Sequence, residues 1–225
     1  MSNISTKEGI YICLEGLKGA GKTTVFEQVV EKIAQTNIEF TTVAPTKAAS
    51  EDDWIEKLIK KYPLLKEKRL PRVFLYAHRS NYAADHAQWH KPLILGERSL
   101  ITSYATKRTY KRWKTRWNFK VIDTLEHKIR VPDYVIYIDV SHRVLRERIE
   151  SRNKARDMDD TPLRLLQMEE AYYEMMHHQP IERIKDVKWL RISGEDPLDV
   201  VVENVYDTIL RIYESENVRG LQYGS

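Results

Sequence analysis

Short apolar runs alternate along the chain with longer stretches of helical periodicity. The short runs are predicted as buried strands, because each is bounded by turn-forming residues and holds consecutive apolar positions. Five strands are predicted, at residues 9–15, 39–44, 93–96, 134–140 and 187–192. Helices are predicted at residues 22–35, 51–61, 71–90, 120–130, 142–151, 162–178 and 197–214. This alternation favours an α/β fold, a five-stranded parallel sheet with crossover helices on both faces.

A glycine-rich segment between the first predicted strand and helix fits the phosphate-binding pattern G-x-x-x-x-G-K-[ST] at every fixed position. With the threonine that follows, its residues are Gly16, Leu17, Lys18, Gly19, Ala20, Gly21, Lys22, Thr23 and Thr24. The glycines let the backbone wrap around a polyphosphate, which then faces amide N–H groups and a helix N-terminus. Lys22 is expected to reach the β- and γ-phosphates, and the Thr23 hydroxyl to bind Mg²⁺. The segment predicts a site for a nucleoside triphosphate.

Two further motifs are candidates for contacts with phosphate. Glu97-Arg98-Ser99 directly follows the third predicted strand. Parallel sheets bind ligands beyond the carboxyl ends of their strands, so Glu97 is placed to join the Mg²⁺ shell and Arg98 to pair with a phosphoryl oxygen. A surface ion pair at a strand end is the other interpretation. Arg79, in the helix predicted at 71–90, is either a clamp for a second phosphate or an arginine that extends to solvent.

A basic run at residues 146–156 leads into an acidic, turn-like stretch. Basic side chains on a mobile segment can close over a triphosphate, exclude water and neutralise the charge that develops during transfer. We expect a small mobile lid at about residues 150–162, with Arg152 and Arg156 as catalytic arginines. A solvated charged face is the alternative.

Composition narrows the class of protein. The chain has 225 residues, 42% of them hydrophobic, which suits a single domain spanning residues 1–225. No stretch approaches the roughly 18 apolar residues of a membrane span, and the polar N-terminus lacks a signal peptide's apolar core. Cys13 is the only cysteine, so no intrachain disulfide can form. We therefore expect a cytoplasmic protein without membrane contact, whose net charge of +4 suits an anionic substrate.

The segment from Lys107 to Lys120 holds seven basic residues, four aromatics and no acid. Cations interleaved with flat rings are typical of contact with single-stranded nucleic acid. The alternative is an amphipathic helix whose Tyr110, Trp113 and Trp117 face the core while its basic residues face water. A larger or more anionic acceptor, bound by this segment and Lys18, is a third interpretation.

Together these segments resemble the thymidylate kinase family and, more broadly, the deoxynucleoside kinases, over nearly the whole chain. Residues 14–24 are similar to the family's E-G-x-[DE]-G-A-G-K-T-T, and residues 74–79 to the segment whose arginine binds the monophosphate. Glu97-Arg98-Ser99 stands where thymidylate kinases carry D-R-Y and reads as the E-R-S of deoxynucleoside kinases. Residues 132–140 resemble the family's P-D-x-x-[IL]-Y-L-D-V strand, and residues 193–198 the loop that holds adenine.

The resemblance implies a three-layer P-loop NTPase fold and transfer of the γ-phosphoryl group of Mg·ATP to a nucleotide or nucleoside. It implies that Arg98 spans the donor and acceptor phosphoryl groups and that Arg79 clamps the acceptor phosphate. Arg148 is expected to stack on adenine, and Glu195 lies in the adenine loop. Family members often form homodimers, which adds a second copy of the chain to the expected partners.

The chain departs from the family on the acceptor side. Lys18 replaces the acidic residue that contacts the sugar 3′-hydroxyl, and Leu75 replaces the phenylalanine that stacks on thymine. Thr106 and Lys107 align with the tyrosine and glutamine that contact the nucleotide. Ala44 stands where deoxynucleoside kinases carry their general base, which argues against a nucleoside acceptor. The predicted acceptor-binding residues are Lys18, Leu75, Tyr76, Arg79, Arg98, Thr106 and Lys107.

The sequence thus favours a nucleotide kinase that phosphorylates a (deoxy)nucleoside monophosphate, dTMP or another. An acceptor phosphate is already ionised, so the absence of a base at Ala44 fits this acceptor. One alternative is a kinase acting on a modified nucleotide or a polynucleotide, suggested by the Lys107–Lys120 segment. The other is a non-catalytic, ATP-binding regulatory protein that kept the phosphate-binding loop.

Overall fold

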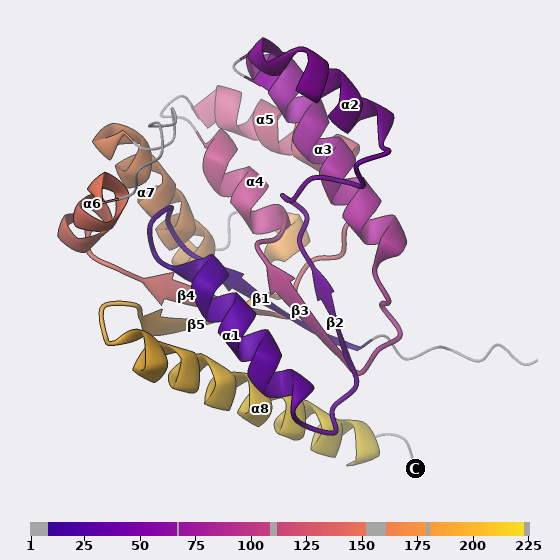
Figure 1. The fold of residues 1–225 in the computed structure, drawn as a ribbon, viewed down its shortest axis with the longest axis vertical. Coiled ribbons are helices and arrows are strands. Elements are labelled where there is room, and N and C mark those ends of the chain that lie inside the picture. Colours follow the sequence, from indigo (N-terminus) through magenta and orange to yellow (C-terminus); the bar gives the residue numbers. More distant parts are fainter. Residues whose placement is uncertain (1–8, 67, 109–111, 152–160, 179–180, 223–225) are drawn as a thin grey trace, which may run out of the picture.

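A five-stranded, all-parallel sheet forms the centre of the molecule. The computed structural model describes residues 9–66, 68–108, 112–151, 161–178 and 181–222 (Figure 1). The strands are β1 (Ile10–Glu15), β2 (Phe40–Val43), β3 (Leu93–Glu97), β4 (Tyr134–Asp139) and β5 (Lys188–Ser193). They lie in the order β2-β3-β1-β4-β5. Each strand lies within a residue or two of its predicted range, and the parallel sheet predicted from the sequence is confirmed.

Helices cover both faces of this sheet, as the three-layer fold requires. They are α1 (Lys22–Ala34), α2 (Trp54–Lys61), α3 (Arg69–His86), α4 (Leu100–Lys107), α5 (Arg112–Leu125), α6 (His142–Glu150), α7 (Pro162–His178) and α8 (Leu198–Gln222), with 3₁₀ turns at Pro63–Lys66 and Glu182–Ile184. Helices α1 and α8 pack together on one face, and α4 and α7 on the other (Figure 1). None of the helices described is long and apolar enough to cross a membrane.

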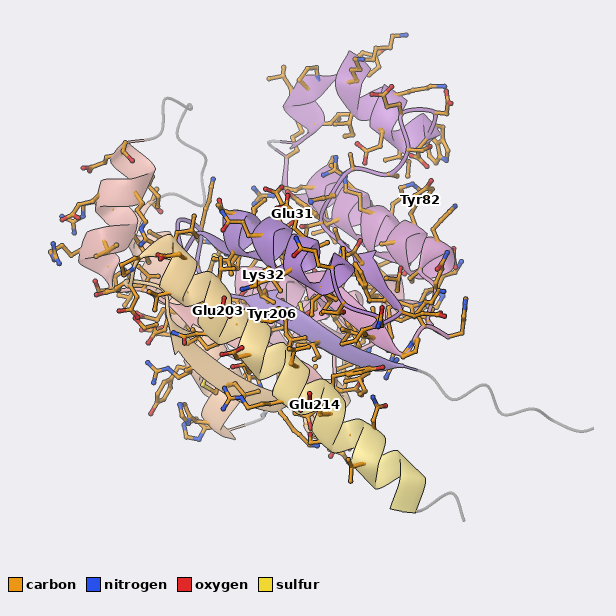
Figure 2. All side chains as sticks on the ribbon, turned by 60° about the horizontal axis from the view of Figure 1, so that its bottom comes forward. Glu31, Lys32, Tyr82, Glu203, Tyr206 and Glu214 are labelled. Carbon is orange, nitrogen blue, oxygen red and sulfur yellow. The ribbon has the colours of Figure 1, made fainter. Side chains whose placement is uncertain are left out.

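An ion pair and a ring contact join the two helices of the first face. Lys32 of α1 pairs with Glu203 of α8, and its ammonium group lies 4.6 Å from the centre of the Tyr206 ring (Figure 2). These contacts are partly exposed, so most of the attachment comes from the apolar residues buried beneath them.

The helices on the second face differ most from the sequence-based expectation. The sequence-based prediction has no helix at the position of α4. Ser99 before an apolar stretch is nevertheless an N-cap signal, and the Ser99 hydroxyl accepts a hydrogen bond from the Ile101 N–H at 3.2 Å. Helix α5 begins at Arg112 rather than 120 and ends at Leu125 rather than 130. Lysine and arginine are good helix formers, so the basic segment extends the helix toward its N-terminus.

The core-facing interpretation of the α5 aromatics is corrected by the structure. Trp113 is 68% exposed and Trp117 63% exposed, whereas Asn118 and Ile122 are buried. Tyr110 lies outside the described residues. Because 118 and 122 are one helical turn apart, they define the inward face, and both tryptophans lie on the outward side of the helix.

Glu15, the last residue of β1, is fully buried and connects three elements. Its carboxylate accepts hydrogen bonds from the Ser99 N–H and hydroxyl and from the hydroxyls of Thr102 and Tyr172, at 2.8 to 2.9 Å. A buried carboxylate is tolerated only when its lone pairs are satisfied, so these donors fix α4 and α7 against the end of β1. Burial and the Glu15 charge raise the pKa of Tyr172, which keeps this phenol protonated as a donor.

The Tyr172→Phe substitution is expected to lower the free energy of unfolding by about 1–3 kcal/mol, because Glu15 loses one of its donors. Urea unfolding at neutral pH measures this difference. Tyr173→Phe is the matched control, since Tyr173 lies on the same helix and is exposed. Equal stability of the two variants would contradict the role assigned to the Glu15 contacts.

Candidate functional site

The glycine-rich loop adopts a conformation that only glycine accommodates at key points. Gly16 has φ 146°, and a Cβ there would lie 2.7 Å from the carbonyl oxygen of Ile138. Gly21 has φ 86° and precedes α1 without any side-chain cap, so the helix N-terminus faces the loop's interior. The Lys22 ammonium donates to the Leu17 carbonyl at 2.7 Å across the loop. The loop thus has the shape of an anion cradle.

Thr23 and Glu97 meet at the mouth of this loop. The Thr23 hydroxyl donates to one carboxylate oxygen of Glu97, and the Lys47 ammonium lies 2.7 Å from the other. Burial raises the pKa of Glu97, but the bonds from Lys47 and Thr23 outweigh burial and hold the pKa below its ordinary value. Hard oxygen ligands are those that Mg²⁺ prefers, so this pair fits a magnesium ion that also contacts phosphate. Among the described residues, no cluster of three or more His, Cys, Asp or Glu side chains forms a separate metal site.

Arg98 is held in a strained backbone conformation. Its φ of 68° is the only positive φ of a non-glycine residue in the described part of the chain. The Arg98 N–H donates to the Leu14 carbonyl at 3.1 Å, which continues the pairing of β1 with β3. Strain of this kind concentrates at functional sites, where the surrounding structure imposes it. Here it directs the guanidinium away from the strand end and into a cavity.

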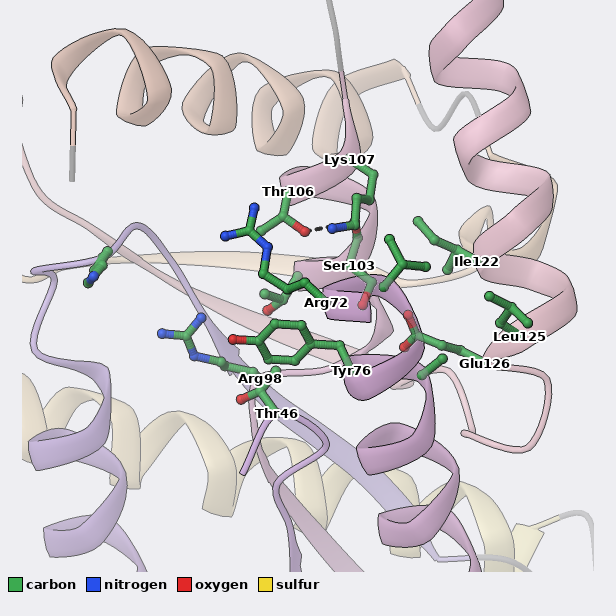
Figure 3. Close-up of a pocket in the computed structure, with 14 residues that line it drawn as sticks. Thr46, Arg72, Tyr76, Arg98, Ser103, Thr106, Lys107, Ile122, Leu125 and Glu126 are labelled. Carbon is green, nitrogen blue, oxygen red and sulfur yellow. Dashed lines mark hydrogen bonds between the residues drawn. The ribbon is translucent and has the colours of Figure 1, made fainter. Parts of the chain in front are cut away.

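This cavity, the Arg98 cavity, has a volume of about 250 Å³ and lies between α3, α4 and the start of the glycine-rich loop (Figure 3). Its lining residues are Lys18, Thr46, Arg72, Val73, Tyr76, Ala77, Arg98, Thr102, Ser103, Thr106, Lys107, Ile122, Leu125 and Glu126. Of the predicted acceptor-binding residues, Lys18, Tyr76, Arg98, Thr106 and Lys107 are therefore brought together. Arg72, Ser103 and Glu126 also line the cavity, although none of them is among the residues predicted to form the site.

Arg79 and Leu75 are not among the lining residues, but Arg79 lies beside the Arg98 cavity: it donates to the Thr46 carbonyl at 3.4 Å and lies 5.7 Å from the centre of the Tyr76 ring. Leu75 is 2% exposed, and the Arg79 guanidinium donates twice to Glu56 of α2, at 2.5 and 2.7 Å. Arg72, Tyr76 and Arg79 follow one face of α3, at spacings of four and three residues, and the ion pair with Glu56 holds Arg79 at the border of the cavity. The arginine that lines the cavity from this helix is Arg72.

A second cavity lies on the other side of the loop. This cavity, the Arg148 cavity, is lined by Gly19, Ala20, Gly21, Thr24, Val25, Arg148, Ser151, Gly194, Asp196, Leu198 and Val201. Arg148 donates to the Gly194 carbonyl at 2.8 Å, which places α6 against the loop after β5. The Glu195 carboxylate accepts from the Ser141 N–H at 2.7 Å and is not among the lining residues. Arg152 and Arg156, and most of the expected lid, lie outside the described residues.

A third, largely apolar groove lies between α3 and α5. Phe74, Trp113 and Trp117 line it together with Lys107, Lys114 and Lys120. Both tryptophans are thus available for contact with a partner, and the prediction of nucleic-acid contact at this segment stays a prediction.

Comparisons with known proteins agree with this geometry. The family model described as "Thymidylate kinase" matches residues 14–205. The chain belongs to the thymidylate kinase family. Chains of this family are ATP-dependent nucleoside-monophosphate kinases.

Individual relatives are distant but match over most of their length. The chain is 25% identical to a thymidylate kinase of Clostridium novyi (strain NT), covering 88% of this chain and 97% of the relative. It is 24% identical to one of Staphylococcus epidermidis, covering 89% and 97%. Among solved structures, the thymidylate kinase from Candida albicans, described as having broad substrate specificity, superposes with a TM-score of 0.62 at 15% identity. The superposition covers 91% of this chain and 92% of the Candida albicans chain. This last likeness supports the fold.

In the absence of nucleotide, the Glu97→Gln substitution is expected to lower the free energy of unfolding by an amount that depends on pH. The folded-state pKa of Glu97 is lowered, so its stabilisation is present above the ordinary glutamate value of 4.5 and is lost as the pH falls through the folded-state pKa. Urea unfolding between pH 7 and pH 3 measures the difference between wild type and variant. Glu31→Gln, at an exposed position on α1, is the control. A difference that does not shrink on acidification would contradict the ion pair.

Proposed function

We propose that this kinase transfers the γ-phosphoryl group of Mg·ATP to the 5′-phosphate of a (deoxy)nucleoside monophosphate bound in the Arg98 cavity. One observation carries the proposal: the glycine-rich loop separates two cavities, and the strained Arg98 extends from the loop side into one of them. A donor in the Arg148 cavity and an acceptor in the Arg98 cavity would meet at the loop, which is the arrangement that in-line transfer requires.

On the donor side, the loop amides and the N-terminus of α1 hold the triphosphate. Lys22 then exchanges its bond with the Leu17 carbonyl for the β- and γ-phosphate oxygens. Arg148 and the backbone of Gly194 and Asp196 border the place for adenine. Thr23 and Glu97 would hold a magnesium ion, which would neutralise phosphate charge when bound. Because Lys47 pairs with Glu97, this lysine would have to shift to admit the ion.

On the acceptor side, four cations line the cavity: Lys18, Arg72, Arg98 and Lys107. They attract the monophosphate and neutralise charge during transfer, and the ionised acceptor oxygen needs no general base. Catalysis therefore rests on positioning and electrostatics. Arg79 would reach the acceptor through the nitrogen that bonds the Thr46 carbonyl, while its other two nitrogens stay paired with Glu56. The proposal also includes Arg152 and Arg156 as catalytic arginines, because they lie in the basic run at residues 146–156.

The Lys22→Ala substitution is expected to lower kcat by at least about a hundredfold, because a positioned cation is removed from the transferring phosphates. The measurement is ADP release with Mg·ATP and a panel of deoxy- and ribonucleoside monophosphates, dTMP included. Lys32→Ala is the matched control, since Lys32 lies on the same helix but pairs with Glu203 on the surface. Wild-type activity in the Lys22 variant would overturn the donor site, and absence of turnover with every monophosphate would overturn the proposed reaction.

A further inference from the structure

A buried carboxylate forms part of the wall of the Arg98 cavity. Glu126, just beyond the end of α5, is only 5% exposed and is one of the lining residues. Its carboxyl group points toward Ser103 and the cavity interior, on the side away from Arg98 (Figure 3). Burying a carboxylate costs free energy unless its oxygens are bonded, so its place in a ligand-sized cavity calls for an explanation.

The surroundings of Glu126 keep it in place and leave it able to accept hydrogen bonds. Arg183 donates to the backbone carbonyls of Glu126 and Ile129 at 2.9 and 2.8 Å, which fixes the segment. Burial raises the pKa of the Glu126 carboxyl above its ordinary value, and the polar side chains of Ser103 and Ser80 with the charges of Arg183 and Lys107 limit that rise. A carboxylate has about four acceptor positions, more than the two nearby hydroxyl groups could fill, so positions remain for a ligand.

Glu126 lies on the side of the cavity away from Arg98, where one end of a bound acceptor would lie. This step rests on the proposed function: an acceptor with its phosphate at Arg98 would extend past Tyr76 toward the far wall of the cavity, and Figure 3 shows Tyr76 between Arg98 and Glu126. That wall is formed by Ser103 and Glu126 and by the apolar Ile122 and Leu125. The base is therefore the part of the acceptor that Glu126 would contact.

We propose that Glu126 selects an acceptor whose base presents an exocyclic amino group, with guanine the best match. An ionised carboxylate only accepts hydrogen bonds. Guanine offers it two adjacent donors, the ring N1–H and the 2-amino group, and cytosine and adenine each offer one amino group. Thymine offers a single N–H between two carbonyl oxygens, which the carboxylate repels. A site built around a buried hydrogen-bonding group discriminates strongly against a base that leaves it unpaired.

The test is equilibrium binding of dGMP, dCMP, dAMP and dTMP to the wild-type protein and to Glu126→Gln, measured without ATP so that no transfer is needed. We expect dGMP to bind at least tenfold more tightly than dTMP to the wild type. The glutamine amide both donates and accepts and can pair with the N–H and a carbonyl of thymine, so we expect this ratio to fall at least tenfold in the variant. Glu216→Gln, on α8 and remote from the cavity, is the control and keeps the wild-type ratio.

Each outcome decides the proposal. Wild-type protein that binds dTMP as tightly as every amino-bearing monophosphate overturns it, and so does protein that binds none of the four. A Glu126→Gln variant that weakens binding of all four equally also overturns it, because that result shows a structural role only. Turnover is measured separately on the same panel: a base preference in binding that depends on Glu126 but leads to no ADP supports this inference and refutes the proposed reaction.

Discussion

The buried carboxylate of Glu15 is the interaction on which the arrangement of the site depends. It lies at the end of the central strand β1, directly before the first glycine of the phosphate-binding loop. Ser99, Thr102 and Tyr172 must all reach it, because a buried charge without donors would cost more than the marginal stability of a domain allows. The turn after β3 is thereby fixed beside the loop. Arg98, which lies in that turn, has its strained conformation imposed by this contact and by the strand pairing.

The contacts of Glu15 and the strand register together determine which residues lie on each side of the phosphate-binding loop. The register places Leu14 of β1 beside Glu97 of β3, so the carboxylate that meets Thr23 and the arginine that enters the Arg98 cavity emerge at one edge of the sheet. The donor side is built from backbone and from Arg148, which contacts the loop after β5. The acceptor side is built from helices α3, α4 and α5, whose side chains differ from the family pattern. A phosphate-binding loop of the family's pattern is thus combined with a cavity wall of this chain's own composition.

The sequence predicted the sheet and the phosphate-binding loop because both depend on local patterns: consecutive apolar positions, and glycines at fixed spacing before a helix. It could not predict that Arg72 lines the cavity while Arg79 is held at its border, because both lie on one face of α3 and only the pairing of Arg79 with Glu56 of α2 distinguishes them. The exposure of Trp113 and Trp117 has the same origin, since their helical spacing suits either side of α5. Glu126 had no motif to identify it. Its burial arises from contacts between elements distant in the sequence.

The measurement that tests the central claim most directly is the fate of the γ-phosphoryl group. The wild-type protein is incubated with ATP labelled in its γ-phosphate, Mg²⁺ and the panel of nucleoside monophosphates, and the products are separated and identified. The account predicts that label appears in the β-phosphate of one nucleoside diphosphate, in equal amount to the ADP formed. Label found only as inorganic phosphate or on the protein itself would contradict it.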